Sequence, residues 1–170
     1  MKTKDKLSIR GKFFIEHIRD GKVIYKGEFH NLVTTVGKSE LLDNGLDGST
    51  GYMFLISSVD YSTIVVGDTM SSHAGWKEAG AVNAPNYSGN RKTCVWDSGA
   101  SGAKALSSAL NFTFSELGTV KGGGIVFGSG ALATKDDTNG VLFSAALFDE
   151  GDREVITNDQ INVSYEVTIS

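Results

Sequence analysis

The last run of the chain constrains the fold most, because its polarity alternates residue by residue. The apolar positions of this run are Ile161, Val163, Tyr165, Val167 and Ile169, and polar residues separate them. A period of two places alternate side chains on opposite faces of a β-strand. We therefore expect a strand here, with one face on a core and the other in solvent.

The start of the chain predicts a β-hairpin. Residues 7–16 alternate between apolar and polar side chains, and a second strand-like run covers residues 23–29. Asp20 and Gly21 lie between the two runs. An Asp-Gly pair is typical of a two-residue hairpin turn, since both of its central residues need a positive φ.

Between these ends the sequence indicates further strands and one helix. Strands are expected at residues 52–56, 93–97, 110–114, 119–127 and 141–148. Residues 52–56 are apolar throughout, which predicts a strand covered on both faces. The run 119–127 contains Gly122, Gly123 and Gly124, which predict a kink or bulge. A short helix is expected over residues 36–44, capped near Thr34 or Thr35 and stopped by Gly45.

This pattern predicts an all-β fold with one short helix. Eight or nine strands without strand–helix alternation favour an antiparallel β-sandwich or a jelly-roll-like barrel. The 170 residues suit a single domain over residues 7–170, preceded by a basic N-terminal arm at residues 1–6. A long loop is expected at residues 67–92, and a connection of that length in a compact domain is often functional.

The charge is unevenly distributed along the chain. The net charge is −4, yet residues 1–30 hold eight Lys or Arg against four Asp or Glu. An acidic balance argues against nucleic acid as a partner. Lys2, Lys4 and Lys6 suggest an arm that binds an acidic neighbour, such as the turn at residues 149–154 of another copy. A solvated terminus is the alternative.

No membrane or export signal is expected. The apolar residues that follow the basic start are interrupted by Arg10, Lys12, Glu16 and His17, unlike the core of a secretory signal peptide. No apolar run approaches the length of a membrane span. We therefore expect no membrane partner and assembly in a cytoplasm.

The sequence carries no recognisable catalytic or metal-binding motif. His17, His30 and His73 lack metal-ligand spacing. Asp68 and two serines lie near His73, but the Gly-x-Ser-x-Gly elbow of a hydrolase is missing, which favours a polar turn over a catalytic triad. We expect a non-enzymatic protein with no catalytic residue, no metal and no cofactor.

Two further segments have a structural and a functional interpretation. The single cysteine, Cys94, excludes an internal disulfide and is expected to be buried and inert. Residues 136–140 carry oxygen ligands without the spacing of an EF-hand, which favours a solvated hairpin loop over a weak calcium site. Paired carboxylates for sugar hydrolysis stay an open alternative.

Three stretches taken together resemble a family of small virion proteins of tailed bacteriophages. The first runs from Gly11 through Asp20-Gly21 to Gly37. The second is the block at residues 68–78, which contains Ser-His-Ala-Gly-Trp-Lys-Glu and is followed by Tyr87 and Arg91. The third is the ending, with a glycine turn, residues 141–148 and the alternating last strand. The chain departs from the family pattern at residues 98–109.

The resemblance implies a capsid decoration or cement protein located in the virion. Its expected partners are the major capsid protein and copies of itself, with a trimer favoured because shells offer threefold positions. Aromatic residues and arginine commonly anchor protein interfaces. The residues expected to bind protein are Lys2, Lys4, Lys6, His73, Trp76, Tyr87 and Arg91.

Two alternatives stay open at this point. A tail or fibre-attachment protein would follow from the same fold and family. A lectin-like β-sandwich that binds host glycans belongs to a different class. For Trp76 and His73, a structural role inside the domain is the alternative to an interface role.

Overall fold

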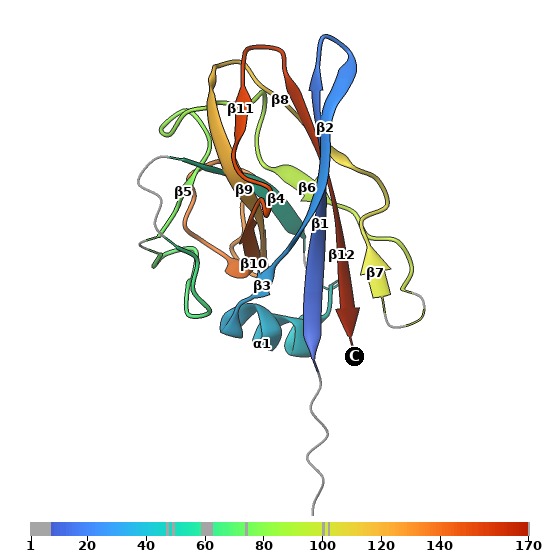
Figure 1. The fold of residues 1–170 in the computed structure, drawn as a ribbon. Coiled ribbons are helices and arrows are strands. Elements are labelled where there is room, and N and C mark those ends of the chain that lie inside the picture. Colours follow the sequence, from blue (N-terminus) through green and yellow to red (C-terminus); the bar gives the residue numbers. More distant parts are fainter. Residues whose placement is uncertain are drawn as a thin grey trace, which may run out of the picture.

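A computed structural model describes residues 8–46, 48, 50–58, 63–73, 75–99, 101 and 103–169. Two antiparallel sheets face each other, and helix α1 (Thr35–Asn44) lies at one end of the pair (Figure 1). None of the helices in these ranges is long and apolar enough to cross a membrane. Lys2, Lys4 and Lys6 lie outside the described residues.

The first sheet has five strands in the order β2-β1-β12-β7, with β8 also paired to β12. Its strands are β1 (Ile9–Arg19), β2 (Lys22–His30), β7 (Ala103–Ala105), β8 (Leu110–Thr113) and β12 (Gln160–Ile169). The alternating last run therefore lies in the centre of this sheet. The side chains of Ile161, Val163, Tyr165 and Val167 face the second sheet and are buried.

The second sheet has seven strands in the order β3-β10-β9-β4-β5, with β11 paired to β9 and β6 paired to β4. Its strands are β3 (Leu32–Val33), β4 (Gly51–Ser57), β5 (Lys77–Glu78), β6 (Lys92–Cys94), β9 (Gly118–Phe127), β10 (Val141–Leu147) and β11 (Arg153–Val155).

This arrangement confirms the all-β sandwich. The barrel alternative is wrong, because the strands form two separate sheets instead of one closed sheet. The described ranges hold twelve strands instead of eight or nine, and the difference comes from pieces of two or three residues such as β3 and β5. Runs this short carry too few residues to show an alternating pattern.

The two local predictions at the start of the chain are confirmed. Asp20 and Gly21 have φ values of 49° and 71°, as the hairpin turn between β1 and β2 requires. At the helix, Thr34 Oγ1 accepts a hydrogen bond from the backbone N–H of Gly37 at 3.0 Å. Gly45 ends α1, and its N–H donates to the Leu41 carbonyl at 3.0 Å.

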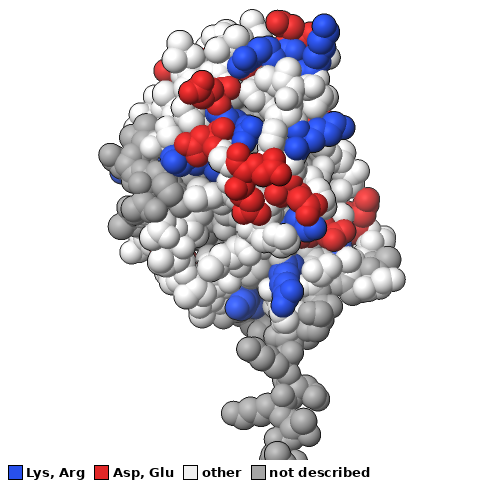
Figure 2. Space-filling model, in the orientation of Figure 1, with Lys and Arg blue, Asp and Glu red and all other residues white. Residues whose placement is uncertain are grey.

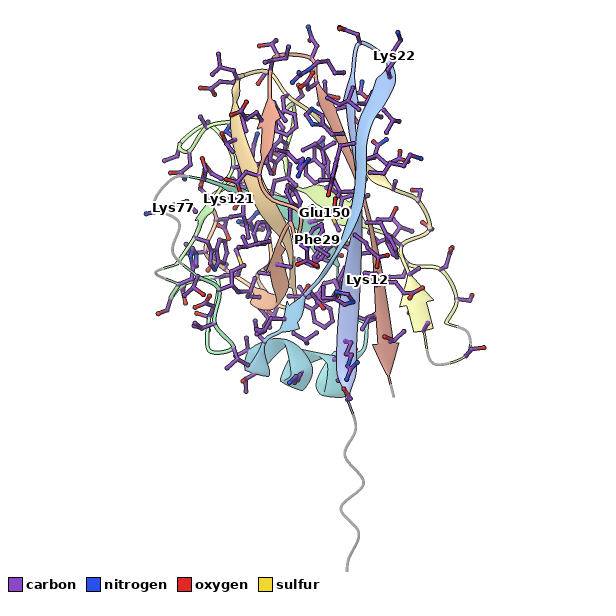
Figure 3. The ribbon with its side chains drawn as sticks, in the orientation of Figure 1. Lys12, Lys22, Phe29, Lys77, Lys121 and Glu150 are labelled. Carbon is purple, nitrogen blue, oxygen red and sulfur yellow. The ribbon has the colours of Figure 1, made fainter. Side chains whose placement is uncertain are left out.

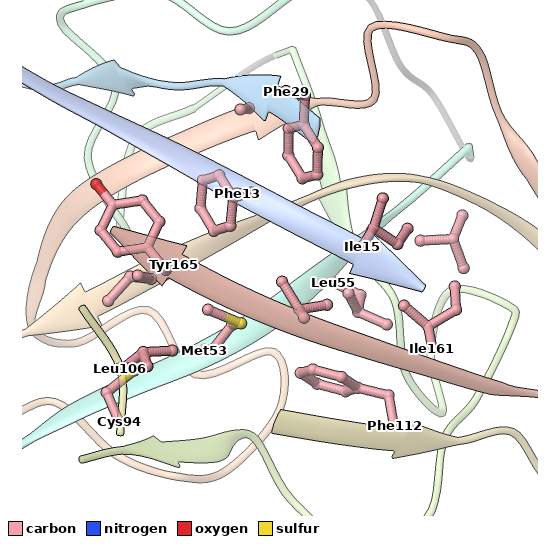
Figure 4. Packing of buried hydrophobic residues seen from close by; sticks show 14 of the residues in the cluster. Phe13, Ile15, Phe29, Met53, Leu55, Cys94, Leu106, Phe112, Ile161 and Tyr165 are labelled. Atoms are coloured by element: carbon pink, nitrogen blue, oxygen red, sulfur yellow. The ribbon is translucent and has the colours of Figure 1, made fainter. Parts of the chain in front are cut away.

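A row of aromatic rings forms the centre of the core. Phe13 on β1 is paired directly with Tyr165 on β12 and with Phe29 on β2. The Phe13 ring lies 4.6 Å from the Tyr165 ring and 4.9 Å from the Phe29 ring, measured between centroids (Figure 4). All three are almost fully buried. Cys94 is also buried, as predicted, and burial raises the pKa of its thiol to about 12.

The bulge predicted at the three glycines of β9 lies at their start, next to Gly122. β9 runs through them without interruption, and they pair with β10 and β4 on either side. The register shift lies beside them, where Ile56 pairs with Gly122 but Ser57 pairs with Val120. A Cβ atom on Gly124 would lie 2.4 Å from Cζ of Phe54. The glycines therefore allow close packing across the sheet.

We predict that Gly124→Ala lowers the free energy of unfolding by about 1–3 kcal/mol, because the added methyl group overpacks the Phe54 ring. Chemical denaturation measures this loss. Gly67→Ala is the matched control, since a Cβ atom there meets nothing within 4 Å. The control should change stability by less than about 0.5 kcal/mol. Equal effects of the two changes would contradict the packing role of Gly124.

Candidate interaction surfaces

The segment 67–92 covers the outer face of the second sheet. Met70 and Trp76 from this segment pack on side chains of β4, β9 and β10 and form a second hydrophobic cluster. The members of that cluster from the sheet are Phe54, Ile56, Val126, Leu142 and Ala145. The prediction that the strand at residues 52–56 is covered on both faces is thereby confirmed.

Trp76 lies inside a stack of three rings. Its ring centroid is 3.7 Å from that of His73 and 5.4 Å from that of Phe54. Its Nε1 donates to Asp68 Oδ2 at 3.2 Å, and only 1% of the residue is exposed. Trp76 therefore offers no free ring face on which a sugar could stack.

His73 and Asp68 do not form the hydrogen bond of a catalytic triad in the described structure. Nδ1 of His73 lies 3.1 Å from the carbonyl oxygen of Trp76. Asp68 Oδ2 accepts from Trp76 Nε1 and from the backbone N–H of Val65. Partial burial lowers the pKa of His73 and disfavours its charged form. The polar-turn interpretation of this segment fits these contacts.

Arg91 and Glu78 form a buried ion pair. Arg91 Nη2 lies 2.6 Å from Glu78 Oε2, and Nε lies 3.0 Å from Oε1, so the contact is bidentate. Arg91 also donates to the carbonyl oxygens of Leu132 and Asp137, which holds the β9–β10 connection against the segment. Burial raises the pKa of Glu78, and Arg91 offsets only part of that rise.

Tyr87 joins the same segment to the first sheet. It forms an isolated β-bridge with Phe114, and its ring packs edge-on against Phe112 at 5.0 Å. Lys135 Nζ lies 4.1 Å from the centre of the Tyr87 ring and donates to the Tyr87 carbonyl oxygen. Tyr87 is 1% exposed. Its contacts thus link the segment to the first sheet and to the β9–β10 connection.

The structure therefore brings the predicted loop residues together, but inside the domain. Trp76, Tyr87 and Arg91 are buried, and His73 is partly buried. As the chain is folded here, the three buried side chains present almost no surface to a partner. A Gly- and Ser-rich segment with scattered aromatics is typical of a binding loop. It is equally typical of an irregular segment that packs on one face of a sheet. The alternative of a structural role fits Trp76 and His73.

A cavity of about 280 Å³ lies between this segment and the β9–β10 connection. Its lining includes Met70, His73, Val82, Asp136 and Asp137.

Nowhere in the described ranges do three or more His, Cys, Asp or Glu residues group in a way that could hold a metal ion. The predicted hairpin loop at 136–140 is tied down, since the Asp136 N–H donates to Glu78 Oε2.

One end of the sandwich carries exposed aliphatic side chains that the sequence analysis did not single out. They lie on the β1–β2 hairpin and on the connections β8–β9 and β11–β12, which meet at the same end (Figure 1). The exposed fractions are 70% for Leu117, 52% for Ile24, 50% for Ile156 and 45% for Val23. We call these four residues the aliphatic end. Lys22 marks the hairpin tip (Figure 3).

A buried ionic cluster holds these connections together. Asp159 Oδ2 lies 2.8 Å from His17 Nε2 and 2.7 Å from Arg19 Nη2, and it accepts the N–H of Ile156 at 3.2 Å. The Asp159 carbonyl accepts the N–H of Phe114. Burial opposes ionisation of Asp159, but the hydrogen bonds from Arg19, His17 and Ile156 outweigh it and hold its pKa at about 2.

Comparisons with known proteins give no match for this chain. No family model, no curated protein and no solved structure matches it. A functional proposal therefore depends on the surfaces described above and on the sequence resemblance.

We predict that Arg91→Met lowers the free energy of unfolding at pH 7 by about 3–5 kcal/mol, because it leaves the Glu78 carboxylate buried without its partner. The loss should shrink as the pH falls toward 5. Burial raises the pKa of Glu78, and removing Arg91 raises it further. As the pH falls, Glu78 in the folded variant takes up a proton. The neutral carboxyl group needs no cationic partner, so the loss of stability becomes smaller.

Denaturation of the variant and the native chain across this pH range checks the prediction. Lys77→Met is a suitable control, since Lys77 is exposed and lies next to Glu78 in β5. A loss that stays constant between pH 7 and 5 would show that Glu78 is not the group left unpaired.

We predict that Asp159 contributes about 2 kcal/mol of stability that is lost in acid. Its pKa falls from an ordinary 3.8 to about 2 in the folded chain. The contribution is therefore present above pH 3.8 and disappears as the pH falls through 2. Asp159→Asn should destabilise the chain at pH 7 and flatten this part of the stability profile. An unchanged acid profile in the variant would contradict the assignment.

Proposed function

We propose that this chain is a non-enzymatic structural protein that binds other protein surfaces in a larger assembly. The observation that carries the proposal is the aliphatic end, where four large side chains are exposed at the start of β2 and on the β8–β9 and β11–β12 connections. Exposed aliphatic groups cost free energy in water unless a partner covers them. The Asp159 cluster braces the loops, which lowers the entropy lost on binding.

The assembly that we propose is the virion of a tailed bacteriophage. The support is the sequence resemblance in three stretches, which include the block at residues 68–78. The role would be that of a capsid decoration or cement protein that binds the major capsid protein and stabilises the head. Such a role suits a stiff sandwich, because many weak contacts on a repeating shell add through avidity.

The proposal is tested first on purified virions of the phage that encodes the chain. A band of 18.1 kDa should appear when intact particles are dissociated and separated on a gel. On the order of hundreds of copies per particle would place it on the shell, whereas a few copies in the symmetry of the tail would favour a tail or fibre-attachment role. Particles that lack the band would overturn the proposal.

We predict that charging the aliphatic end weakens binding to the shell. Leu117→Glu combined with Ile156→Glu should reduce binding to particles stripped of this protein by at least about tenfold, since burying two carboxylates in an apolar contact is costly. Co-sedimentation with the particles measures the binding, and thermal unfolding confirms that the variant folds.

Val82→Glu is the matched control, because Val82 is 77% exposed but lies in the segment 67–92. The control should bind like the native chain. Full binding by the double variant would show that the aliphatic end is not the contact surface.

A further inference from the structure

β2 leaves one edge of the first sheet open. Within the described parts of the chain it pairs with β1 alone. The N–H of Asn31 donates to the carbonyl of Gly11, which fixes the alternation of hydrogen bonds along this pair. Because the direction of these groups alternates along β2, the backbone N–H and C=O groups of Lys26, Glu28 and His30 point away from β1. Those of Lys26 and Glu28 have no partner among the described residues.

An acceptor from outside the sheet already binds one of these outward groups. The His30 N–H donates to Asp149 Oδ2 at 3.4 Å. Nearby, the Tyr25 hydroxyl donates to Glu150 Oε2 at 3.1 Å. These contacts bring the connection between β10 and β11 alongside β2, as the position of Glu150 in Figure 3 shows. The open edge thus lies next to residues 149–154.

This connection is strongly acidic. Together with the start of β11 it holds Asp149, Glu150, Asp152, Arg153 and Glu154, and the four carboxylates are exposed. The cation among these residues, Arg153, is held inward, with its guanidinium 3.6 Å from the centre of the Tyr25 ring, and Lys121 Nζ lies 3.0 Å from Asp152 Oδ2. Figure 2 shows acidic side chains gathered over the middle of this face. A strand added to β2 would therefore lie beside a row of carboxylates.

The chain itself contains a segment of matching charge and spacing. Lys2, Lys4 and Lys6 alternate with Thr3 and Asp5. In an extended strand, alternate side chains point to the same face. We infer that residues 2–6 of a second copy bind as an added strand on the open edge of β2, with the three lysines over residues 149–154. The inference deepens the proposed assembly role, because it assigns the contact between copies.

The same chain cannot bring residues 2–6 level with Lys26 on this edge. β1 begins at Ile9, and Lys26 lies level with Glu16, seven residues along β1. At about 3.3 Å per residue this distance is about 23 Å. Leu7 and Ser8 would also have to reverse the chain and cross to the outer side of β2. Residues 2–6 would then end short of Lys26.

Disulfide trapping between full-length chains tests the contact. Thr3→Cys and Asp5→Cys chains are each mixed with Lys26→Cys and Glu28→Cys chains under mild oxidation. In the proposed strand, Thr3 and Asp5 share the outer face with Lys26 and Glu28, within the Cα separation that a disulfide allows. Cys94 does not compete, because it is buried and its pKa is raised to about 12.

At least one mixture should give a linked product of about twice 18.1 kDa. Asn111→Cys is the control acceptor, since Asn111 is exposed on β8 at the other side of the same sheet. It should give no product with either donor. No product with Lys26→Cys and Glu28→Cys, or equal product with the control, would overturn the inference.

A charge exchange tests the role of the lysines. The donor variant replaces three lysines with Glu, at Lys2, Lys4 and Lys6. The acceptor variant replaces three carboxylates with Lys, at Asp149, Glu150 and Asp152. Each variant alone should slow trapping by about tenfold or more. Combining the two variants should restore trapping, and salt should slow it in the native pair. Failure to restore it, with both variants folded by circular dichroism, would contradict the charge contact.

These outcomes are independent of the virion test. Trapping uses the purified chain alone, so it can fail while the 18.1 kDa band is present in particles. Conversely, trapping without that band would keep the contact between copies and overturn only the virion role.

Discussion

The buried ion pair between Arg91 and Glu78 connects three parts of the chain that have little regular structure of their own. Glu78 lies on the short strand β5, Arg91 precedes β6, and Arg91 also binds carbonyl oxygens of the β9–β10 connection. A bidentate pair of this kind fixes geometry as well as charge. Because it holds the segment 67–92 in place, the outer face of the second sheet stays covered and Trp76 stays buried.

That cover changes where a partner can bind. With Trp76, Tyr87 and Arg91 inside the domain, the surfaces that we assign to partners are the aliphatic end and the open edge of β2 beside residues 149–154. The two surfaces share β2, since Val23 and Ile24 lie at its start, but they differ in chemistry. One suits an apolar contact and the other a charged, extended segment.

Much of the fold could be predicted from the sequence, because local rules decide it. The Asp20-Gly21 hairpin, the capped helix and the alternating last strand each depend on residues close together in the chain. The candidate sites could not be predicted in this way. Whether an aromatic residue in an irregular segment is buried depends on which sheet face that segment covers, and no periodicity records such a contact.

The sequence by itself determined that the chain is all-β, with its apolar side chains on the inner faces of alternating strands and its charge divided between a basic start and an acidic remainder. Only the tertiary structure decided that the second sheet is covered on both faces, that β9 needs Gly124, and that the edge of β2 stays open. These features arise from contacts between residues distant in the chain. The physical reason is that burial and strand pairing are properties of the packed assembly, whereas alternation and turn chemistry are properties of neighbouring residues.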